Sequence, residues 1–279
     1  MSTALRYLGQ RTILGVNFFA GSAQEAIARI RPGGLLVIPA APALKNINCD
    51  AAYRQSLLAA DLALADSALM VLVWNLIAHD HLDRLSGLRY LRVLIEEPDV
   101  KQPGNTLWVM PSPTSASTNF AWLASVGVEL DPQHIYMAPK YGLEIDDQAL
   151  LARIERLRPR HIILTLGGGT QERLGLFLKQ HLTYLPAIHC VGAALAFLSG
   201  DQVHIPVWGD KLYLGWLIRC LSDPRRFVPR YWDARKLVFL ILRYRAELPP
   251  LKAPEGRPHQ PALAASVRSE THASSKLLS

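Results

Sequence analysis

The chain has 279 residues, half of them hydrophobic, so it can bury a sizeable core and is too apolar to be a disordered protein. Its longest apolar stretches, 67–78 and 237–242, fall short of the roughly 20 residues that a membrane-spanning helix needs. Its three cysteines are widely spaced, which argues against a disulfide framework or a zinc site and favours a reducing cytoplasm. The formal net charge of +7 is concentrated in residues 211–247, where nine basic residues face three acidic ones, whereas residues 1–210 hold 17 basic and 18 acidic residues.

Apolar, β-branched runs alternate with helical patterns along the chain. The pair Ser22 and Glu25 matches a capping box and predicts an early helix. We then expect strands at 33–40, 105–112, 133–139, 161–168 and 187–194. Helices are expected at 49–65, which leads toward a short strand, and at 117–127, 146–159 and 171–182. This alternation predicts an α/β fold, a Rossmann-like parallel sheet flanked by helices on both faces.

From about residue 210 the pattern becomes helical, basic and aromatic, and after Leu248 it turns to Pro, Ala, Ser and His without periodicity. We therefore predict three parts: a ligand-binding α/β domain at 1–209, a helical appendage at 210–247 and a disordered tail at 248–279.

The stretch "LGGGTQE" follows a predicted strand and opens a predicted helix. Glycines there allow the backbone to approach a ligand, and the free N–H groups of a helix N-terminus attract anions. The stretch has neither the G-x-G-x-x-G spacing nor a G-K-[ST] ending, which disfavours a dinucleotide or ATP site. The glycines equally fit a plain strand-to-helix turn.

Asp66 stands between a predicted helix and an apolar run. Limited access of water at such a place could tune its carboxylate as a general base. The alternative is a simple helix cap, a common role of aspartate.

The basic segment allows two interpretations as well. Its arginines could grip a diphosphate, and its amphipathic pattern near the end could lie in a membrane interface with the cations at the headgroups. Alternatively, it forms an ordinary helix pair whose long cations cover apolar surface. Nucleic acid is disfavoured as a partner because the remainder of the chain is neutral to acidic.

Taken in order, these pieces resemble the WecG/TagA/CpsF family of glycosyltransferases, from about Leu14 to Tyr244. The most specific part is "HIPVWGDKLYLGWLIRCLSDPRRFVPRYW", residues 204–232, where the matching residues are Pro206, Trp208, Trp216, Leu217, Arg219, Pro224, Arg226, Arg230 and Tyr231. Further matches are Asp66 in "ADSALMV", Arg84 and Gly87 in "LDRLSG", Gly167, Gln171 and Glu172 in "LGGGTQE", and Gly192 and Gly200 in "CVGAALAFLSG".

The resemblance implies a UDP-sugar-dependent hexosyltransferase that moves an N-acetylhexosamine onto a polyprenyl-diphosphate-linked acceptor in bacterial surface polysaccharide synthesis. It assigns Asp66 as the catalytic base, and it assigns substrate binding to Arg84, Gly167, Gln171, Glu172, Gly192, Arg219, Arg226 and Arg230. No metal and no cofactor is implied, because the arginines neutralise the leaving diphosphate. The enzyme would sit in the cytoplasm on the inner face of the cell membrane, and it could form a homo-oligomer.

Several family positions differ, and they support an alternative function. The replacements are Pro39 and Ala41 for polar residues, Ser67 for a glycine, Ala196 for an aspartate, His204 for an arginine and Gly215 for a glutamate. A chain without these polar groups could be an inactive relative that binds a sugar nucleotide or acts as a scaffold.

Overall fold

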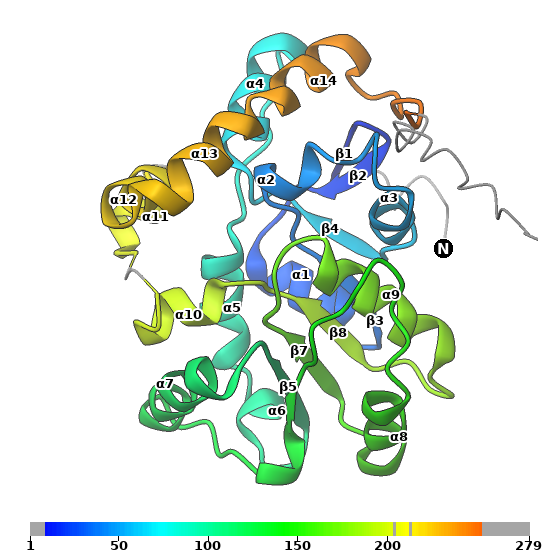
Figure 1. Cartoon of the computed structure of the whole chain (residues 1–279), viewed down its shortest axis with the longest axis vertical. Helices are drawn as coiled ribbons and strands as arrows, with labels where there is room; N and C mark the ends of the chain where they lie inside the picture. Colours follow the sequence, from blue (N-terminus) through cyan, green and yellow to red (C-terminus); the bar gives the residue numbers. More distant parts are fainter. Residues whose placement is uncertain (1–8, 203–204, 212–213, 253–279) are drawn as a thin grey trace, which may run out of the picture.

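The computed structural model describes residues 9–202, 205–211 and 214–252, without the side chains of Val207, Lys211 and Arg226. Through this part of the chain runs a sheet of eight strands, in the order β1-β2-β4-β3-β8-β7-β5-β6 (Figure 1). The strands are β1 (Gln10–Ile13), β2 (Val16–Phe19), β3 (Gly34–Val37), β4 (Leu62–Leu64), β5 (Thr106–Met110), β6 (Ile135–Met137), β7 (His161–Leu164) and β8 (Ala187–Cys190). All neighbours pair in parallel except β1 and β2. The predicted α/β fold with a parallel sheet is confirmed.

The central strands are apolar throughout because helices cover both faces of the sheet. In β3, Leu35 and Val37 point into the core on one face, and Leu36 points into the core on the other. On the first face the core is completed by α2 (Ala41–Leu44), α3 (Ala51–Leu58), α4 (Ala68–Ala78), α8 (Gln148–Leu157) and α9 (Thr170–His181). On the second face it is completed by α1 (Ala23–Ile30), α5 (Gly87–Ile95), α6 (Pro98–Lys101), α7 (Pro113–Ser125) and α10 (Ala194–Ser199).

Local hydrogen bonds fix the start of α1 and the turn between α3 and β4. The capping box is present: Ser22 Oγ accepts from Glu25 N at 3.2 Å, and Glu25 accepts from Ser22 N at 2.8 Å. The helix expected at 49–65 is too long, because α3 ends at Leu58 and residues 62–64 form β4. Between them, the carboxylate of Asp61 accepts from Leu35 N at 2.7 Å and thereby ties the turn to β3.

The C-terminal part of the chain packs back onto the sheet domain. Its helices are α11 (Val207–Lys211), α12 (Gly215–Ser222), α13 (Pro224–Ala234) and α14 (Lys236–Tyr244), and α14 lies alongside α4 at one end of the molecule (Figure 1). Leu237 and Ile241 of α14 are buried in the core, and Asp233 of α13 pairs with Lys45 beside α2 at 2.7 Å. These contacts hold the appendage against the loops at one edge of the sheet.

Beyond α14 the described chain runs along the N-terminal hairpin. Leu14 N and Gly15 N, at the tight turn between β1 and β2, donate to carbonyls of residues 245 and 246. Lys252 N donates to Asn48 O at 2.7 Å. The described residues therefore enter the predicted tail by a few positions, and residues 253–279 lie outside them. The division into three parts stays a prediction.

Among the described helices, none is both long and apolar enough to cross a bilayer.

Candidate active site

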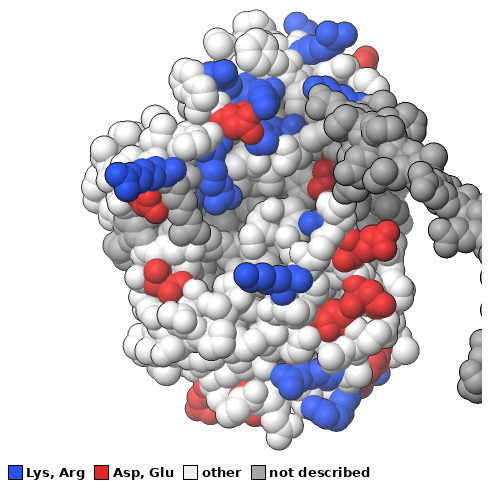
Figure 2. Space-filling model, viewed as in Figure 1, with Lys and Arg blue, Asp and Glu red and all other residues white. Residues whose placement is uncertain are grey.

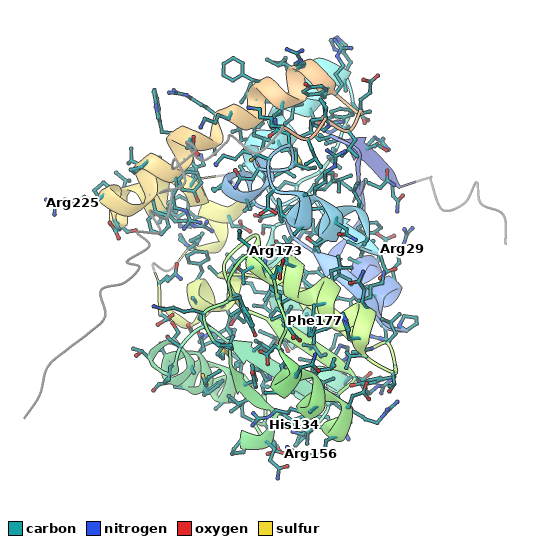
Figure 3. The ribbon with its side chains drawn as sticks, turned by 45° about the vertical axis from the view of Figure 1, so that its right-hand side comes forward. Arg29, His134, Arg156, Arg173, Phe177 and Arg225 are labelled. Carbon is teal, nitrogen blue, oxygen red and sulfur yellow. The ribbon has the colours of Figure 1, made fainter. Side chains whose placement is uncertain are left out.

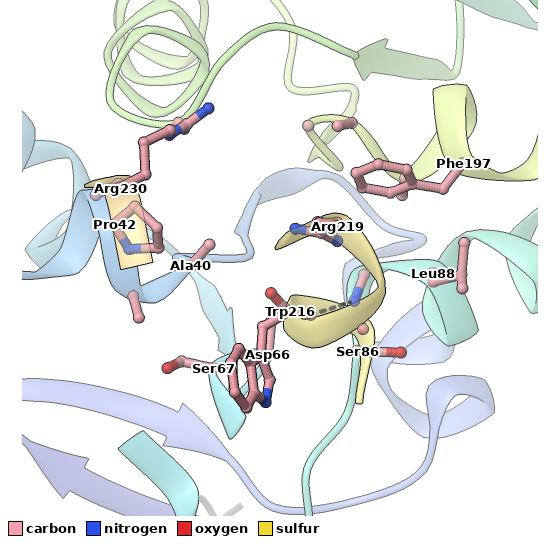
Figure 4. A pocket seen from close by; sticks show the side chains of 18 of the residues that line it. Ala40, Pro42, Asp66, Ser67, Ser86, Leu88, Phe197, Trp216, Arg219 and Arg230 are labelled. Atoms are coloured by element: carbon pink, nitrogen blue, oxygen red, sulfur yellow. Dashed lines mark hydrogen bonds between the residues drawn. The ribbon is translucent and has the colours of Figure 1, made fainter. Parts of the chain in front are cut away.

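The loops at the carboxyl ends of five parallel strands line one cavity of about 1070 Å³. Because β3, β4, β5, β7 and β8 are parallel, the loops that follow them meet at the same edge of the sheet, where α/β proteins bind ligands. Residues of α12 and α13 complete the lining, among them Trp216, Arg219 and Arg230 (Figure 4). A cavity of this size can hold a ligand larger than a drug-sized molecule.

Asp66 follows β4 and lines this cavity, with its side chain 25% exposed. Its Oδ1 accepts from Gly87 N at 3.0 Å, and no described residue donates a hydrogen bond to its Oδ2. Ser67, not Asp66, caps α4, because Ser67 Oγ accepts from Met70 N at 3.1 Å. Asp66 therefore does not cap α4, but its carboxylate accepts the N–H of Gly87, the first residue of α5, so the helix-cap alternative holds at α5. Among the described residues none donates to Oδ2, which leaves that oxygen to accept a proton from a ligand.

Arg84 holds the backbone around this aspartate. Its Nε donates to the carbonyl oxygen of Asp66 at 2.6 Å, and its Nη2 lies 3.5 Å from Asp66 Oδ1. Its Nη1 contacts both the carbonyl and the carboxylate of Asp210, at 2.9 and 3.0 Å. The side chain is only 14% exposed, so Arg84 positions other groups as well as lining the cavity.

The three glycines form a strand-to-helix turn that also lines the cavity. Gly167 and Gly168 are exposed in the cavity wall, and Gly169 is the N-cap of α9 with a φ of 92°, which residues with a Cβ rarely adopt. A Cβ on Gly168 would meet the side chain of Ala43 at 3.2 Å, whereas one on Gly167 would meet nothing within 4 Å. The turn therefore needs glycine for its geometry at Gly169, and it exposes the backbone of Gly167 and Gly168 to the cavity. Contact of this backbone with a ligand stays a prediction.

Gln171 and Glu172 use their side chains inside the protein. Gln171 lines the cavity but is 3% exposed, and its Oε1 accepts from Gly192 N at 2.7 Å, which joins the loops after β7 and β8. Glu172 is fully buried and does not line the cavity; it accepts from Gly169 N at 2.6 Å. Burial raises the pKa of the Glu172 carboxyl to about 7, against the lowering effect of its hydrogen bonds.

We expect Glu172→Gln to change the pH dependence of stability. Between pH 4.5, the ordinary pKa of a glutamate, and the folded-state pKa of about 7, the folded protein keeps a proton on Glu172 that the unfolded chain releases. The wild type therefore loses stability as pH rises through this interval, whereas glutamine cannot ionise. Urea unfolding at pH 5, 6, 7 and 8 should show the variant gaining stability relative to wild type up to about pH 7. A difference independent of pH would contradict this environment of Glu172.

Two of the predicted arginines line the cavity from the appendage. Arg219 of α12 donates from Nη1 to Tyr231 Oη at 2.9 Å, and its guanidinium carbon lies 4.0 Å from the centre of the Phe197 ring. Its Nε is buried, and no described residue accepts a hydrogen bond from it. Arg230 of α13 is exposed and makes no ion pair or hydrogen bond with a described residue (Figure 4). An anionic ligand could satisfy both cations.

The side chain of Arg226 lies outside the described residues, as does His204. The cavity thus brings together seven of the nine predicted site residues: Asp66, Arg84, Gly167, Gln171, Gly192, Arg219 and Arg230.

Sequence reasoning missed a polar end of the cavity. Ser115 Oγ of α7 donates to Asp201 Oδ2 at 2.7 Å, and Asn119 Oδ1 accepts from Ser199 Oγ at 2.6 Å. It also missed Asp210, which approaches Arg84 across 126 residues of sequence. No spacing rule connects residues so far apart, and only the shared strand edge could have suggested Ser115. In the described part of the chain, no three His, Cys, Asp or Glu side chains gather as metal ligands would.

A comparison with known protein families finds one match. The glycosyl transferase WecG/TagA/CpsF family matches residues 11–250, which is most of the chain. The chain belongs to this family. Its members are glycosyltransferases of cell-surface polysaccharide synthesis. None of the curated proteins matches the chain.

Four of the six positions at which the sequence of this member of the WecG/TagA/CpsF family was expected to depart from the family pattern line the cavity. Ala41, Ser67, Ala196 and Gly215 all line it. Ser67 has a local role as the cap of α4, but the other three present no polar side-chain atom to a ligand. Asp201 and Asp210 supply carboxylates to the same cavity.

Proposed function

We propose that the chain transfers an N-acetylhexosamine from a UDP-sugar to a polyprenyl-diphosphate-linked acceptor during synthesis of a surface polysaccharide such as an exopolysaccharide. One observation carries the proposal: the same cavity is lined by the Asp66 carboxylate, whose Oδ2 receives no hydrogen bond from a described residue, and by the cations of Arg219 and Arg230. A base and a diphosphate-binding wall are the two groups that this transfer requires.

In the proposed reaction, Asp66 Oδ2 takes the proton of the acceptor hydroxyl, and the acceptor oxygen attacks the anomeric carbon of the donor sugar. The bond from that carbon to the diphosphate oxygen breaks, and UDP leaves with the electron pair. Arg219 and Arg230, with Arg226 from the same helix as Arg230, stabilise the negative charge that develops on the diphosphate. The backbone of Gly167 and Gly192 approaches the donor, and Gln171 and Glu172 hold their loops in place.

The apolar side of the cavity supports a lipid-linked acceptor. Leu69 and Leu72 of α4 line it together with Trp232 of α13 and Val238 of α14. Outside the cavity, α4 and α14 also carry exposed apolar side chains at Leu76, Phe239 and Leu242. Lys and Arg side chains gather over α13 and α14 (Figure 2). We infer that this surface binds the cytoplasmic face of the membrane, with the cations at the anionic headgroups.

The second candidate is an inactive relative that binds a sugar nucleotide or acts as a scaffold, and the apolar Ala41 and Ala196 in the cavity wall favour it. A transfer assay separates the two functions. Purified protein is incubated with UDP-N-acetylhexosamines, their uronates and UDP-hexoses, each with a polyprenyl-diphosphate-linked monosaccharide. A lipid-linked disaccharide supports the transferase, whereas UDP binding without product from any donor supports the inactive relative.

We expect Arg230→Ala to weaken UDP binding about 10-fold, because a charge-assisted hydrogen bond contributes about 1.5–3 kcal/mol and this arginine is partly solvated. Arg225→Ala is the matched control. Arg225 lies on the same helix, is exposed, and points away from the body of the molecule without lining the cavity (Figure 3). Calorimetric titration with UDP measures both variants. Equal affinities of the two variants would contradict the proposed diphosphate site.

A further inference from the structure

Asp210 joins the appendage to the loop that carries the proposed base. It lies on α11, and its carboxylate is 12% exposed. One oxygen accepts from Ser86 Oγ at 2.5 Å, and the other lies 3.0 Å from Arg84 Nη1. Its carbonyl oxygen accepts from the same Arg84 nitrogen at 2.9 Å. The appendage thus meets Arg84 through both the backbone and the side chain of one residue.

These contacts and those of Asp66 converge on the first turn of α5. Ser86 is the N-cap of that helix: its Oγ accepts from Arg89 N at 3.1 Å while donating to Asp210. The next residue, Gly87, donates its N–H to Asp66 Oδ1 at 3.0 Å. Two carboxylates from distant parts of the chain are thus held side by side at one helix end, and Arg84 lies between them.

Arg84 divides its contacts unequally between the two carboxylates. Its Nη1 is within hydrogen-bond distance of Asp210 at 3.0 Å, whereas its Nη2 is 3.5 Å from Asp66 Oδ1, beyond an ordinary hydrogen bond. Of the two carboxylates, Asp210 therefore makes the closer contact with the guanidinium. A guanidinium that is paired with one carboxylate attracts a second carboxylate less strongly. The second carboxylate is then more available to accept a proton from a ligand.

We propose that Asp210 is a positioning residue that keeps Asp66 available as the base when the appendage is closed over the cavity. This inference rests on the proposed transfer reaction. Without the Asp210 charge, Arg84 turns toward Asp66 and pairs with its carboxylate, which is then less available to take the proton of the acceptor.

The other charged groups around this cavity do not replace Asp210. Among the described residues, those that line it are Asp201, Arg219, Arg230 and Arg235, besides Asp66, Arg84 and Asp210. The carboxylate of Asp201 is held by Ser115 on α7, and the three arginines add further positive charge. Among the described residues that line the cavity, Asp210 is therefore the carboxylate within hydrogen-bond distance of the Arg84 guanidinium.

The test compares Asp210→Asn with wild type. Asparagine keeps the shape and one acceptor oxygen but removes the charge. We expect UDP affinity to stay within about 2-fold and kcat to fall about 10-fold, less than the ~10²–10⁴-fold that loss of a general base causes. Asp210→Glu keeps the charge and should restore most of the lost kcat, which a role of the side chain in folding alone would not predict. Asp233→Asn removes the ion pair of the appendage with Lys45 and is the matched control, expected to leave kcat unchanged.

A second readout does not depend on turnover. In a crystal structure of Asp210→Asn, Arg84 Nη2 should lie closer to the Asp66 carboxylate than the present 3.5 Å. An unchanged distance would overturn the role of Asp210, whether or not the protein transfers sugar. A shortened distance in a protein that makes no product from any donor would support the coupling of the two carboxylates and contradict the proposed transfer reaction instead.

Discussion

Asp66→Asn is expected to reduce sugar transfer by roughly 10²–10⁴-fold, the usual effect of removing a general base, while UDP binds with unchanged affinity. The reason is geometric. Asp66 Oδ1 accepts from Gly87 N, whereas Oδ2 receives no hydrogen bond from a described residue and can take the acceptor proton. Asparagine preserves the first contact and cannot take the proton. The measurement is the rate of lipid-linked product formation at saturating donor, together with calorimetric UDP titration of the same preparation.

Asp83→Asn provides the matched control for this variant. Asp83 is exposed, stands next to Arg84 in sequence and does not line the cavity. Its replacement should leave both rate and affinity unchanged. If Asp66→Asn turned over as fast as wild type, Asp66 would not be the base. If it lost UDP binding in parallel with activity, the residue would bind the donor and not act on the acceptor.

The second large effect concerns the membrane. Replacing both Phe239 and Leu242 by Asp should reduce binding to vesicles that contain phosphatidylglycerol by roughly 100-fold, since each apolar side chain transferred from water contributes about 1.5–3 kcal/mol. Both side chains are more than half exposed, at 68% and 51%, on the helix that also carries Arg243. Because they are not buried in the core, the variant should fold like wild type. Co-sedimentation with vesicles of increasing lipid concentration measures the effect.

Leu143→Asp controls for exposed hydrophobicity in general, because Leu143 is 83% exposed in the segment after β6, far in sequence from the appendage. It should bind vesicles like wild type. High salt should weaken the wild-type interaction, because the cations over α13 and α14 contribute to it. Equal binding of the double variant and wild type would show that another surface, or none, contacts the membrane.

The sheet was predictable because its strands are short, apolar and buried on both faces, and because glycine, proline and capping residues separate them. The run "HIILTLGG" illustrates this: residues 161–164 form β7, and the glycines form the turn. The N-terminal hairpin was missed. Its β1 lies at the edge of the sheet and its residues, Gln10–Ile13, are only partly apolar, so they carry no continuous hydrophobic signal.

Much of the site was predictable for a different reason. Residues that follow parallel strands must meet at one edge, so Asp66, Gly167 and Gly192 lie around one cavity. The sequence did not reveal in which direction each side chain points. Glu172 follows Gln171 directly, yet its helix turns it into the core. The contacts of Asp210 were also hidden, because they depend on how the appendage folds back across more than a hundred residues.

The most direct test of this account is calorimetric titration of the wild-type protein with UDP, followed by the panel of UDP-sugars. The cavity should bind UDP with micromolar affinity, and one UDP-N-acetylhexosamine should bind more tightly than UDP-hexoses. Absence of binding to UDP and to every UDP-sugar would contradict the central claim that the cavity between the sheet edge and α12–α13 is a sugar-nucleotide site.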